Sequence, residues 1–477
     1  MTKKFSFFII AAFYSFFINA RDFNRPNIIW IVAEDMSQDQ GCYGNELVKT
    51  PAIDKLAKEG MRFTNMYTTA AVCAPSRSAL ATGLYQTSFG AMHMRFPDEL
   101  MPMLPKGVRT IEHILKENGY QTLGVGKNDY MFRQEFNSFE FSSIDDLSPE
   151  KPFFAKVNST FTHRVFKRDS SNLVDKDMVE LPAYYPDAEP IREDWAAYLE
   201  NVQLLDGEVK DILDRFERRE LLKNTIIFFF SDHGRPFLKG KYWTYDSGIQ
   251  IPFIVYVPKG MDSPFGFSAG SVNNQMLSSI DISATTLALA GIKKPEYMHG
   301  RVFLGEQVEP EREYIFSSID RISGTYFKTR AVRSKKYKYI KNYNNGRSIL
   351  DCTTEYARAK YPDYNVISIL DNYNKLNEVE KSLVTPLPPE ELYDIENDPF
   401  EIYNLAYKEE FQKVRIKMET VLTSWLQDID DKGLGSDSPE IQKAFIDFKA
   451  NSKERYATER LKMYLEVEKK LKEEGKL

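Results

Sequence analysis

Residues 27–33 read NIIWIVA, and the two residues that follow them are Glu34 and Asp35. The run is apolar at nearly every position, which is typical of a strand that is buried on both faces of a parallel sheet. Residues 225–230 (TIIFFF) repeat this pattern further along the chain. Because such strands alternate with helical patterns, we expect a large α/β domain with a mixed, mostly parallel sheet sandwiched by helices.

The remaining elements follow from the same periodicities. The sequence predicts helices over residues 50–60, 110–119, 194–222 and 281–290, and strands over residues 122–126 and 251–257. After about residue 325 the pattern changes, because residues 331–343 alternate like an antiparallel strand and residues 410–428 and 438–475 read as helices. We therefore divide the chain into a catalytic domain at 21–325 and a smaller α+β subdomain at 326–477, which has an antiparallel sheet and terminal helices.

The composition and the N-terminal residues limit the class of protein to which the chain can belong. A net charge of −6 over 477 residues argues against a nucleic-acid binder, which would carry a basic patch. Two lysines followed by an apolar run and Ile-Asn-Ala predict a cleaved secretory signal at residues 1–20. No cysteine directly follows the predicted cut, so a lipid anchor is not expected. We expect a periplasmic or secreted protein without stable membrane insertion; the alternative is a retained N-terminal anchor.

Only three cysteines occur, at positions 42, 73 and 352. Two of them, Cys42 and Cys352, are too few for a disulfide framework. We expect both to be unpaired, partly buried thiols.

Polar residues follow two of the predicted buried strands. Glu34 and Asp35 follow the first of these strands, and Asp232 and His233 follow residues 225–230. In open α/β sheets, ligands bind beyond the carboxyl ends of the strands. The pattern therefore places these four side chains at the candidate site, although two acids at a strand end can also be merely exposed.

Residues 73–83 read CAPSRSALATG, which resembles the signature of the type I sulfatases, Cys-x-Pro-Ser-Arg followed after four residues by Thr-Gly. These enzymes belong to the alkaline phosphatase superfamily. The resemblance implies that Cys73 is oxidised to formylglycine (3-oxoalanine) by a formylglycine-generating or anaerobic sulfatase-maturating enzyme. It extends from Pro26 to Ala406, where Glu391-Leu392-Tyr393-Asp394 resembles the C-terminal sheet motif of the family.

The resemblance also implies one calcium ion per chain, held by carboxylate and amide oxygens. The ligand positions of the family correspond here to Glu34, Asp35, the modified residue 73, Asp232 and His233. Glu34 departs from the aspartate of the family by one methylene group. His233 would either bind the metal or contact a sulfate oxygen.

Further motif positions carry the implied chemistry of a formylglycine hydrate that attacks sulfur. Arg77 would support the ionised hydrate from a helix expected to begin at Ser76, and Lys127 and Lys241 would bind sulfate. His163, after the Pro-Phe-Phe strand, would protonate the leaving alcohol, with Lys241 sharing this role. The histidine of the family's Gly-Lys-x-His segment is replaced by Asp129, so either Asp129 or another group must act as base when sulfate leaves.

The implied function is that of a secreted sulfatase acting on a sulfated polysaccharide or its oligosaccharides, such as ulvan, a carrageenan or a glycosaminoglycan. His93, Arg95 and Arg321 are candidate contacts to the sugar. Two alternatives are kept: a phosphate or phosphonate ester hydrolase of the same superfamily, and a non-catalytic relative that binds sulfated glycans. We make no prediction of the oligomeric state.

Overall fold

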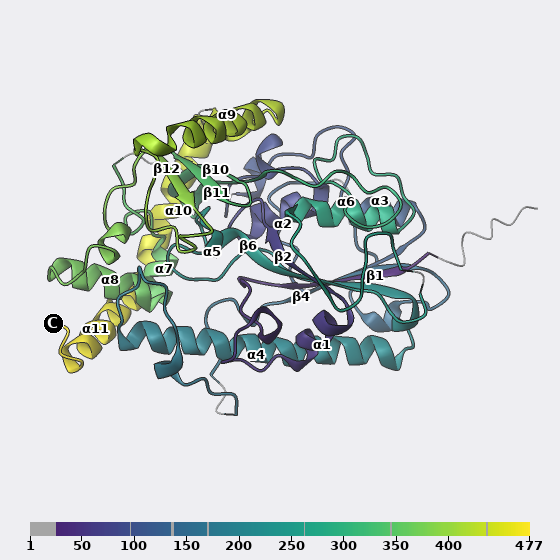
Figure 1. Ribbon diagram of the computed structural model, residues 1–477, viewed down its shortest axis with the longest axis horizontal. Coiled ribbons are helices and arrows are strands. Elements are labelled where there is room, and N and C mark those ends of the chain that lie inside the picture. The colour runs from purple at the N-terminus through teal and green to yellow at the C-terminus, as the bar shows by residue number, and fades with distance from the viewer. Residues whose placement is uncertain are drawn as a thin grey trace, which may run out of the picture.

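The computed structural model describes residues 25–95, 97–134, 138–168, 171–261, 263–343, 346–435 and 437–477. The predicted signal peptide at residues 1–20 lies outside the described residues. The described chain forms a large sheet covered by helices and a smaller sheet with its own helices (Figure 1).

The large sheet has eight strands in the order β3-β4-β1-β5-β6-β2-β7, with β8 paired beside β2. Its strands are β1 (Asn27–Ala33), β2 (Met61–Tyr67), β3 (Gln121–Val125), β4 (Phe153–Ser159), β5 (Thr225–Ser231), β6 (Gln250–Tyr256), β7 (Ser271–Asn273) and β8 (Leu277–Ser278). β1 runs parallel to β4 and β5, and β3 runs parallel to β4. β6 is antiparallel to both of its neighbours, β5 and β2. The predicted mixed, mostly parallel sheet is confirmed.

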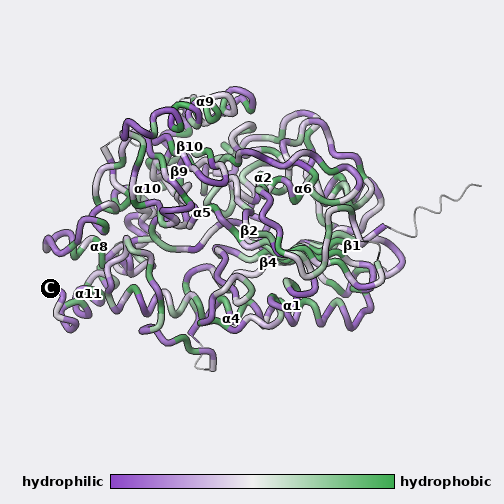
Figure 2. The backbone as a smooth tube through the Cα atoms, viewed as in Figure 1, coloured by the Kyte–Doolittle hydropathy of each residue, from purple (hydrophilic) through white to green (hydrophobic). Residues whose placement is uncertain are grey.

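Helices cover both faces of this sheet (Figure 1). They are α1 (Pro51–Glu59), α2 (Cys73–Thr82), α3 (Ile111–Glu117), α4 (Glu189–Arg218) and α6 (Ser279–Leu289). Apolar side chains of α1 and α4 share a core with Ile29 and Ile31, whereas those of α3 and α6 share a core with Ile28 and Trp30. The alternation along β1 thus supplies two opposite apolar faces, and Figure 2 shows hydrophobic residues concentrated along these central strands.

Two helices begin earlier than the sequence predicts. The long helix α4 begins at Glu189 rather than at residue 194 and ends at Arg218. Pro190 lies in its first turn, where a missing N–H costs no intrahelical hydrogen bond. α2 begins at Cys73 rather than at Ser76, because the Ser76 N–H already bonds to the carbonyl oxygen of Val72 at 3.1 Å.

The small sheet is antiparallel, in the order β12-β11-β10-β9. Its strands are β9 (Ile315–Ile322), β10 (Thr325–Arg333), β11 (Tyr337–Asn342) and β12 (Glu390–Asp394). The prediction of one strand over residues 331–343 is wrong: a turn separates β10 from β11, and the Ser334 N–H bonds to the Tyr337 carbonyl at 2.8 Å. The proposed boundary between residues 325 and 326 falls inside β10, directly after its first residue.

The C-terminal helices are α7 (Glu355–Lys360), α8 (Pro362–Asn372), α9 (Gln412–Asp428), α10 (Pro439–Arg455) and α11 (Ala457–Glu473). α9 covers the small sheet, where Trp425 stacks on Phe316 with ring centroids 4.6 Å apart. The single helix expected over residues 438–475 is instead α10 and α11, which are separated at Tyr456. The break allows α11 to pack on α7 and α8 and to pair Lys470 with Glu193 of α4.

A buried charge network joins the two sheets. Asp246, the first residue of α5 (Asp246–Ile249), pairs with Arg333 of β10 at 3.0 Å and with Lys338 of β11 at 2.9 Å. Lys338 also contacts Glu401 at 3.0 Å. All four side chains are buried, so their charges are satisfied almost entirely by one another.

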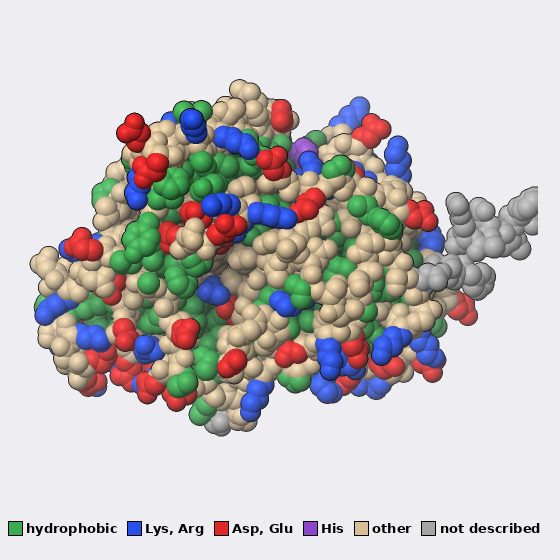
Figure 3. All heavy atoms as spheres, viewed as in Figure 1, with side chains coloured by type: hydrophobic (Ala, Val, Ile, Leu, Met, Phe, Trp, Pro, Cys, Tyr) green, Lys and Arg blue, Asp and Glu red, His purple; other side chains and the backbone are tan. Residues whose placement is uncertain are grey.

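On the face shown in Figure 3, acidic and basic side chains are interspersed. None of the helices in the described part of the chain has the length and apolar character that a bilayer span requires. Cys42 and Cys352 form no disulfide, as expected. Cys352 is buried and Cys42 is half-buried.

Candidate active site

The carboxyl ends of four neighbouring strands meet at one edge of the large sheet. β1 and β5 are in step, with Ala33 opposite Ser231, and β4 ends beside β1, with Ser159 opposite Ala33. The residues that follow β1, β5, β4 and β3 therefore emerge together. These residues include Glu34, Asp35, Asp232, His233, His163 and Lys127, and the first four are the strand-end side chains that the sequence pattern places at the candidate site.

Cys73 faces this edge from the first position of α2. Its Sγ lies 3.3 Å from His233 Nε2 and 3.8 Å from Asp35 Oδ1. The residue is 1% exposed. Burial raises the pKa of the thiol, so Cys73 is held here as an uncharged thiol.

Asp35 connects His233 and Lys241. His233 Nε2 lies 2.9 Å from Asp35 Oδ1, and Lys241 Nζ lies 2.6 Å from Asp35 Oδ2. The other ring nitrogen of His233, Nδ1, donates to the Gly234 carbonyl at 2.9 Å, which leaves Nε2 aimed at the site. Burial alone would raise the pKa of Asp35, but the charges of Lys241 and His233 lower it well below its usual range.

Arg77 is anchored from three sides. Its Nε donates to Asp232 Oδ2 at 2.9 Å, and its Nη1 donates to Asn158 Oδ1 at 2.5 Å and to the Lys127 carbonyl at 3.3 Å. Its Nη2 is buried and has no hydrogen-bond partner among the described residues. A buried guanidinium with an unused donor is suited to an anionic group that binds at this edge.

Asn158 is a residue of this edge that the sequence motifs do not single out. It belongs to β4, accepts the hydrogen bond from Arg77, and donates to the Val125 carbonyl of β3 at 2.9 Å. The available signal was an amide side chain near the end of a strand that begins with two phenylalanines. Asn158 thus ties the guanidinium to two strands of the sheet.

Lys127 begins a chain of alternating charges that leads outward. Its Nζ contacts Glu34 Oε1 and lies 3.0 Å from Asp129 Oδ2. Asp129 Oδ1 in turn accepts from Arg95 Nη1 at 2.9 Å, and the Arg95 side chain is 45% exposed. Burial tends to raise the pKa of Glu34, but the charges of Arg77, His163 and Lys127 lower it to about 2.

His163 presents one nitrogen to the same centre. Its Nδ1 lies 2.6 Å from the Arg164 carbonyl, so Nδ1 carries the proton and Nε2 is available. The preceding residue, Thr162, donates to the Glu34 carbonyl and holds the loop against β1. Burial and the charge of Lys241 lower the pKa of His163.

The donor atoms at this edge could hold a cation. One ligand atom each from Glu34, Asp35, Cys73 and His163 lies within 4.8 Å of the others, and the same holds for Cys73, Asp232 and His233. Three of these side chains are carboxylates, whose oxygens are the ligands that hard divalent cations prefer. The residues present therefore fit a divalent cation, with His163 and His233 as the nitrogen donors of the two groups.

His93 and Arg321 meet at Asp437. His93 Nε2 lies 3.4 Å from one carboxylate oxygen of Asp437, and Arg321 Nε lies 2.6 Å from the other. The hydrogen bond from His93 lowers the pKa of Asp437, whereas burial raises it. The hydrogen bond and charge of Arg321 lower it further, to about 2. Arg95, in contrast, reaches the edge through Asp129.

Family models match most of the chain. A model described as "Sulfatase" matches residues 26–147 and 140–292, and a model described as "N-sulphoglucosamine sulphohydrolase, C-terminal" matches residues 234–383. The matched segments contain the strand ends, Cys73 and Lys241.

Known proteins resemble the chain along most of its length. It is 33% identical to an "Ulvan-active sulfatase" of Formosa agariphila over 88% of this chain and 78% of the relative. Among solved structures, BT4656 in complex with its substrate D-glucosamine-2-N,6-O-disulfate has a TM-score of 0.60 at 18% identity and covers 85% of this chain and 98% of that one. A phosphonate monoester hydrolase of Agrobacterium radiobacter has a TM-score of 0.62 at 17% identity, over 85% and 96% of the two chains.

The two structural likenesses establish the fold, and the family model and the relative from Formosa establish the family. The chain belongs to the type I sulfatases of the alkaline phosphatase superfamily and is a sulfuric ester hydrolase.

Proposed function

We propose that this enzyme removes sulfate from a sulfated polysaccharide or from its oligosaccharides, with an algal glycan such as ulvan, or a glycosaminoglycan, as substrate. The observation that carries the proposal is the position of Cys73, inside the signature motif and within 4 Å of His233 and Asp35. Three relatives from Formosa agariphila, at 33%, 29% and 26% identity, are named ulvan-active sulfatases, which supports the choice of ulvan for the first tests.

The unmodified thiol is poorly suited to be the nucleophile. A thiolate attacks, not a thiol, and burial raises the pKa of Cys73. Conversion of Cys73 to formylglycine would replace the sulfur by an aldehyde whose hydrate supplies an oxygen nucleophile. Because Cys73 is 1% exposed, a maturating enzyme would have access to it only before the domain folds.

We assign the cation site to Glu34, Asp35, Asp232, His233 and residue 73, and the cation to calcium. When bound there, the ion would supply positive charge to a sulfate oxygen. Lys127 and Lys241 would bind the remaining sulfate oxygens, and the unused Nη2 of Arg77 would hold the anionic group at residue 73.

His163 and Lys241 are the groups placed to move a proton to the leaving alcohol. His163 exchanges protons through Nε2, because its Nδ1 is engaged by the Arg164 carbonyl. Lys241 carries its proton on Nζ beside Asp35. Burial and the charge of Lys241 lower the pKa of His163, and the ring can donate from Nε2 only as an imidazolium. Lys241 always carries a proton to donate, so substituting each residue in turn separates the two roles.

We assign Asp129 the role of positioning Lys127, rather than that of a general base. Both of its carboxylate oxygens are engaged, one by Lys127 and the other by Arg95. Although burial acts in the opposite direction, Arg95 and Lys127 lower the pKa of Asp129, which makes it a weaker base. The base that acts when sulfate leaves is then His163 or water.

The first experiment is the mass of the peptide that contains residue 73, from protein produced with a maturating enzyme. Conversion to the aldehyde, together with sulfate release from ulvan oligosaccharides, supports the proposal. A chelator should abolish this release, and re-addition of calcium should restore it more fully than re-addition of zinc. An unmodified thiol in protein that binds the glycan without turnover would instead identify a glycan-binding relative.

The second candidate function is hydrolysis of phosphate or phosphonate esters. The observation that favours it is the fold shared with the phosphonate monoester hydrolase of Agrobacterium radiobacter. A panel of phosphate monoesters, phosphonate monoesters and sulfated glycans, assayed with the same aldehyde-containing protein, separates the two. Faster release from the phosphorus esters than from every sulfated glycan would favour this second function.

We also propose export to the periplasm or the medium, on the basis of the charged and apolar pattern of residues 1–20. N-terminal sequencing of the exported protein should begin at Arg21. Retention of residues 1–20 in a membrane fraction would contradict the proposal.

A further inference from the structure

A hollow of about 390 Å³ lies where the segment of residues 103–110 meets Arg133 and Gln134. Two backbone hydrogen bonds join these segments, from the Leu104 N–H to the Arg133 carbonyl at 3.3 Å and from the Arg133 N–H to the Pro102 carbonyl at 2.8 Å. Met103, Leu104 and Val108 supply apolar lining. The hollow is therefore built by two joined segments and not by a single loop.

The polar lining of this hollow is basic. Lys106, Arg109 and Arg133 are exposed, and none of them forms an ion pair with a described residue. No acid occurs among the described lining residues. Arg109 Nη1 donates to the Val108 carbonyl and Arg133 Nε donates to the Met101 carbonyl, both at 3.1 Å, so each guanidinium is oriented and still has free N–H groups.

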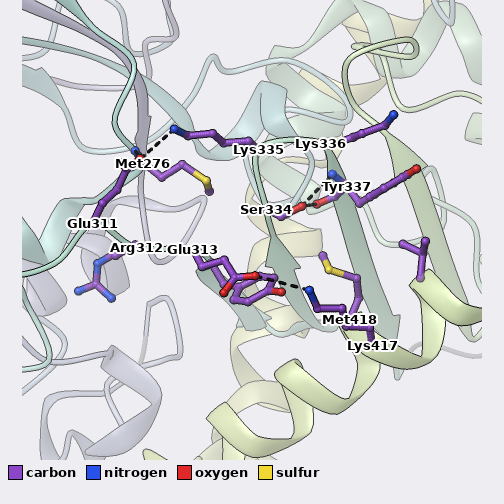
Figure 4. Close-up of a pocket in the computed structure, with 12 residues that line it drawn as sticks. Met276, Glu311, Arg312, Glu313, Ser334, Lys335, Lys336, Tyr337, Lys417 and Met418 are labelled. Carbon is purple, nitrogen blue, oxygen red and sulfur yellow. Dashed lines mark hydrogen bonds and ion pairs between the residues drawn. The ribbon is translucent and has the colours of Figure 1, made fainter.

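In a second hollow of this chain, lysines form ion pairs with glutamates. It has a volume of about 640 Å³ and is lined mainly by residues 311–314, residues 334–337 and one side of α9 (Figure 4). Lys335 pairs there with Glu311 at 2.9 Å, and Lys417 pairs with Glu313 at 3.5 Å. Among the described residues the first hollow has no such acidic partners, so a bound anion would balance its three cations.

The basic hollow lies close to the catalytic edge along the chain. Arg133 follows Asp129 by four residues, and four extended residues span at most about 14 Å. Asp129 itself pairs with Lys127 inside the site and with the half-exposed Arg95. Lys127, Asp129 and Arg133 thus belong to one short segment of the chain, which begins at the catalytic edge and ends in the lining of the hollow, and Arg95 pairs with it at Asp129.

We propose that the hollow lined by Lys106, Arg109 and Arg133 is an accessory site for a second sulfated unit of the polysaccharide whose reacting sulfate ester lies at residue 73. This inference rests on the proposed function. Oriented guanidinium groups bind oxyanions by paired N–H donors, and the apolar lining suits the faces of sugar rings. A polymer held at two points dissociates more slowly than a short oligosaccharide held at one.

The test compares two triple variants that remove the same charge. The first is Lys106→Ser with Arg109→Ser and Arg133→Ser. The control replaces three exposed lysines on and beside α1 that likewise lack ion pairs with described residues: Lys49→Ser, Lys55→Ser and Lys58→Ser. Unchanged melting temperatures show that both variants fold.

Affinity electrophoresis in gels that contain ulvan measures binding, and sulfate release measures activity. We expect the first variant to lose most of its retardation and to lose about tenfold in kcat/KM for the polymer, with kcat/KM for a sulfated disaccharide unchanged. The control variant should match the wild type in all three readouts. Desulfated ulvan should retard neither protein.

Equal retardation of both triple variants, or retardation by desulfated ulvan equal to that by ulvan, would overturn the accessory site. An equal loss of activity on the disaccharide and the polymer would overturn it as well, because the hollow would then act on the catalytic edge. If the wild type releases no sulfate but its retardation still depends on the three cations, the proposed function fails and the binding site stands.

Discussion

The segment of residues 241–246 connects two clusters of buried charge. Lys241 belongs to the cluster at the catalytic edge, and Asp246 belongs to the network between the two sheets. At the catalytic edge, Asp35, Asp232, His233, Lys241 and Arg77 are each 3% exposed or less. Between the two sheets, Asp246, Arg333, Lys338 and Glu401 are each 7% exposed or less. Burial of charge is therefore common to both clusters and does not by itself mark a site.

The clusters differ in how their charges are satisfied. In the network between the sheets, acids and cations alternate, and each carboxylate contacts a cation at about 3 Å. At the catalytic edge, ligand atoms of acids and histidines converge on Cys73 within 4.8 Å, and Arg77 Nη2 has no described partner. Convergence on one reactive atom, with a donor unused, distinguishes the site from the structural network.

The largest effect should come from the residue on which the edge converges. Cys73→Ala should lower kcat/KM by at least about 10³-fold, because the position that carries the nucleophile is lost. The measurement is sulfate release per folded protein, with the free energy of unfolding determined in parallel. Cys42→Ala, which removes a half-buried thiol elsewhere, should keep the activity of the wild type. Equal activity of the two variants would contradict the role of Cys73.

The opposite pattern is expected from the network between the sheets. Lys338→Met leaves Asp246 with Arg333 alone and removes the cation of Glu401, which should lower the free energy of unfolding by about 3–5 kcal/mol. Denaturant unfolding measures this loss, and kcat of the folded fraction should stay within about twofold of the wild type.

The matched control for this change is Lys336→Met. The Lys336 side chain is 45% exposed and its acidic partners lie 3.7 and 3.9 Å away, so the loss should be below about 0.5 kcal/mol. Adding Glu401→Gln to Lys338→Met should recover part of the stability, because no unpaired acid is then left. A loss of kcat as large as the loss of stability would show that the network also shapes the catalytic edge.

Another buried acid, Asp363 in α8, has hydrogen bonds but no ion pair with a described residue. Its carboxylate accepts from the N–H groups of Leu238 and Tyr364, both at 2.8 Å. Burial raises its pKa to about 6, against about 3.9 in the unfolded chain. Between these values the folded state binds more protons, so the free energy of unfolding falls as pH rises from about 4 to 6, by up to about 3 kcal/mol.

Asp363→Asn should remove this pH-dependent contribution to the free energy of unfolding. The difference in unfolding free energy between the wild type and the variant should shrink or reverse between about pH 4 and 6 and stay constant above pH 7. Urea unfolding at several pH values measures it. Parallel curves across the whole range would contradict the raised pKa of Asp363.

Local patterns in the sequence predicted the strands and their polar ends, because an apolar run that stops at acids is a property of neighbouring residues. They could not predict that His93 and Arg321 share Asp437, since this contact joins positions more than 100 residues apart. Local patterns also could not predict the contact of Asn158 with Arg77, whose positions are 81 residues apart. The turn at residues 334–336 was missed because the alternation of β10 continues into β11 without glycine or proline.

The smallest effect should come from Asp129, where the chain departs from the family motif. If its carboxylate positions Lys127 and Arg95, Asp129→Asn keeps a polar contact and should lower kcat/KM by about tenfold. If the carboxylate were the general base, the loss should be about 10²–10⁴-fold in kcat and one limb of the pH profile should vanish. The kcat, KM and pH profile of Asp129→Asn distinguish the two, and Glu140→Asn, an exposed acid paired with Lys116, is the matched control. A tenfold loss with an unchanged pH profile would leave His163 or water as the base and would explain how the edge tolerates the missing histidine.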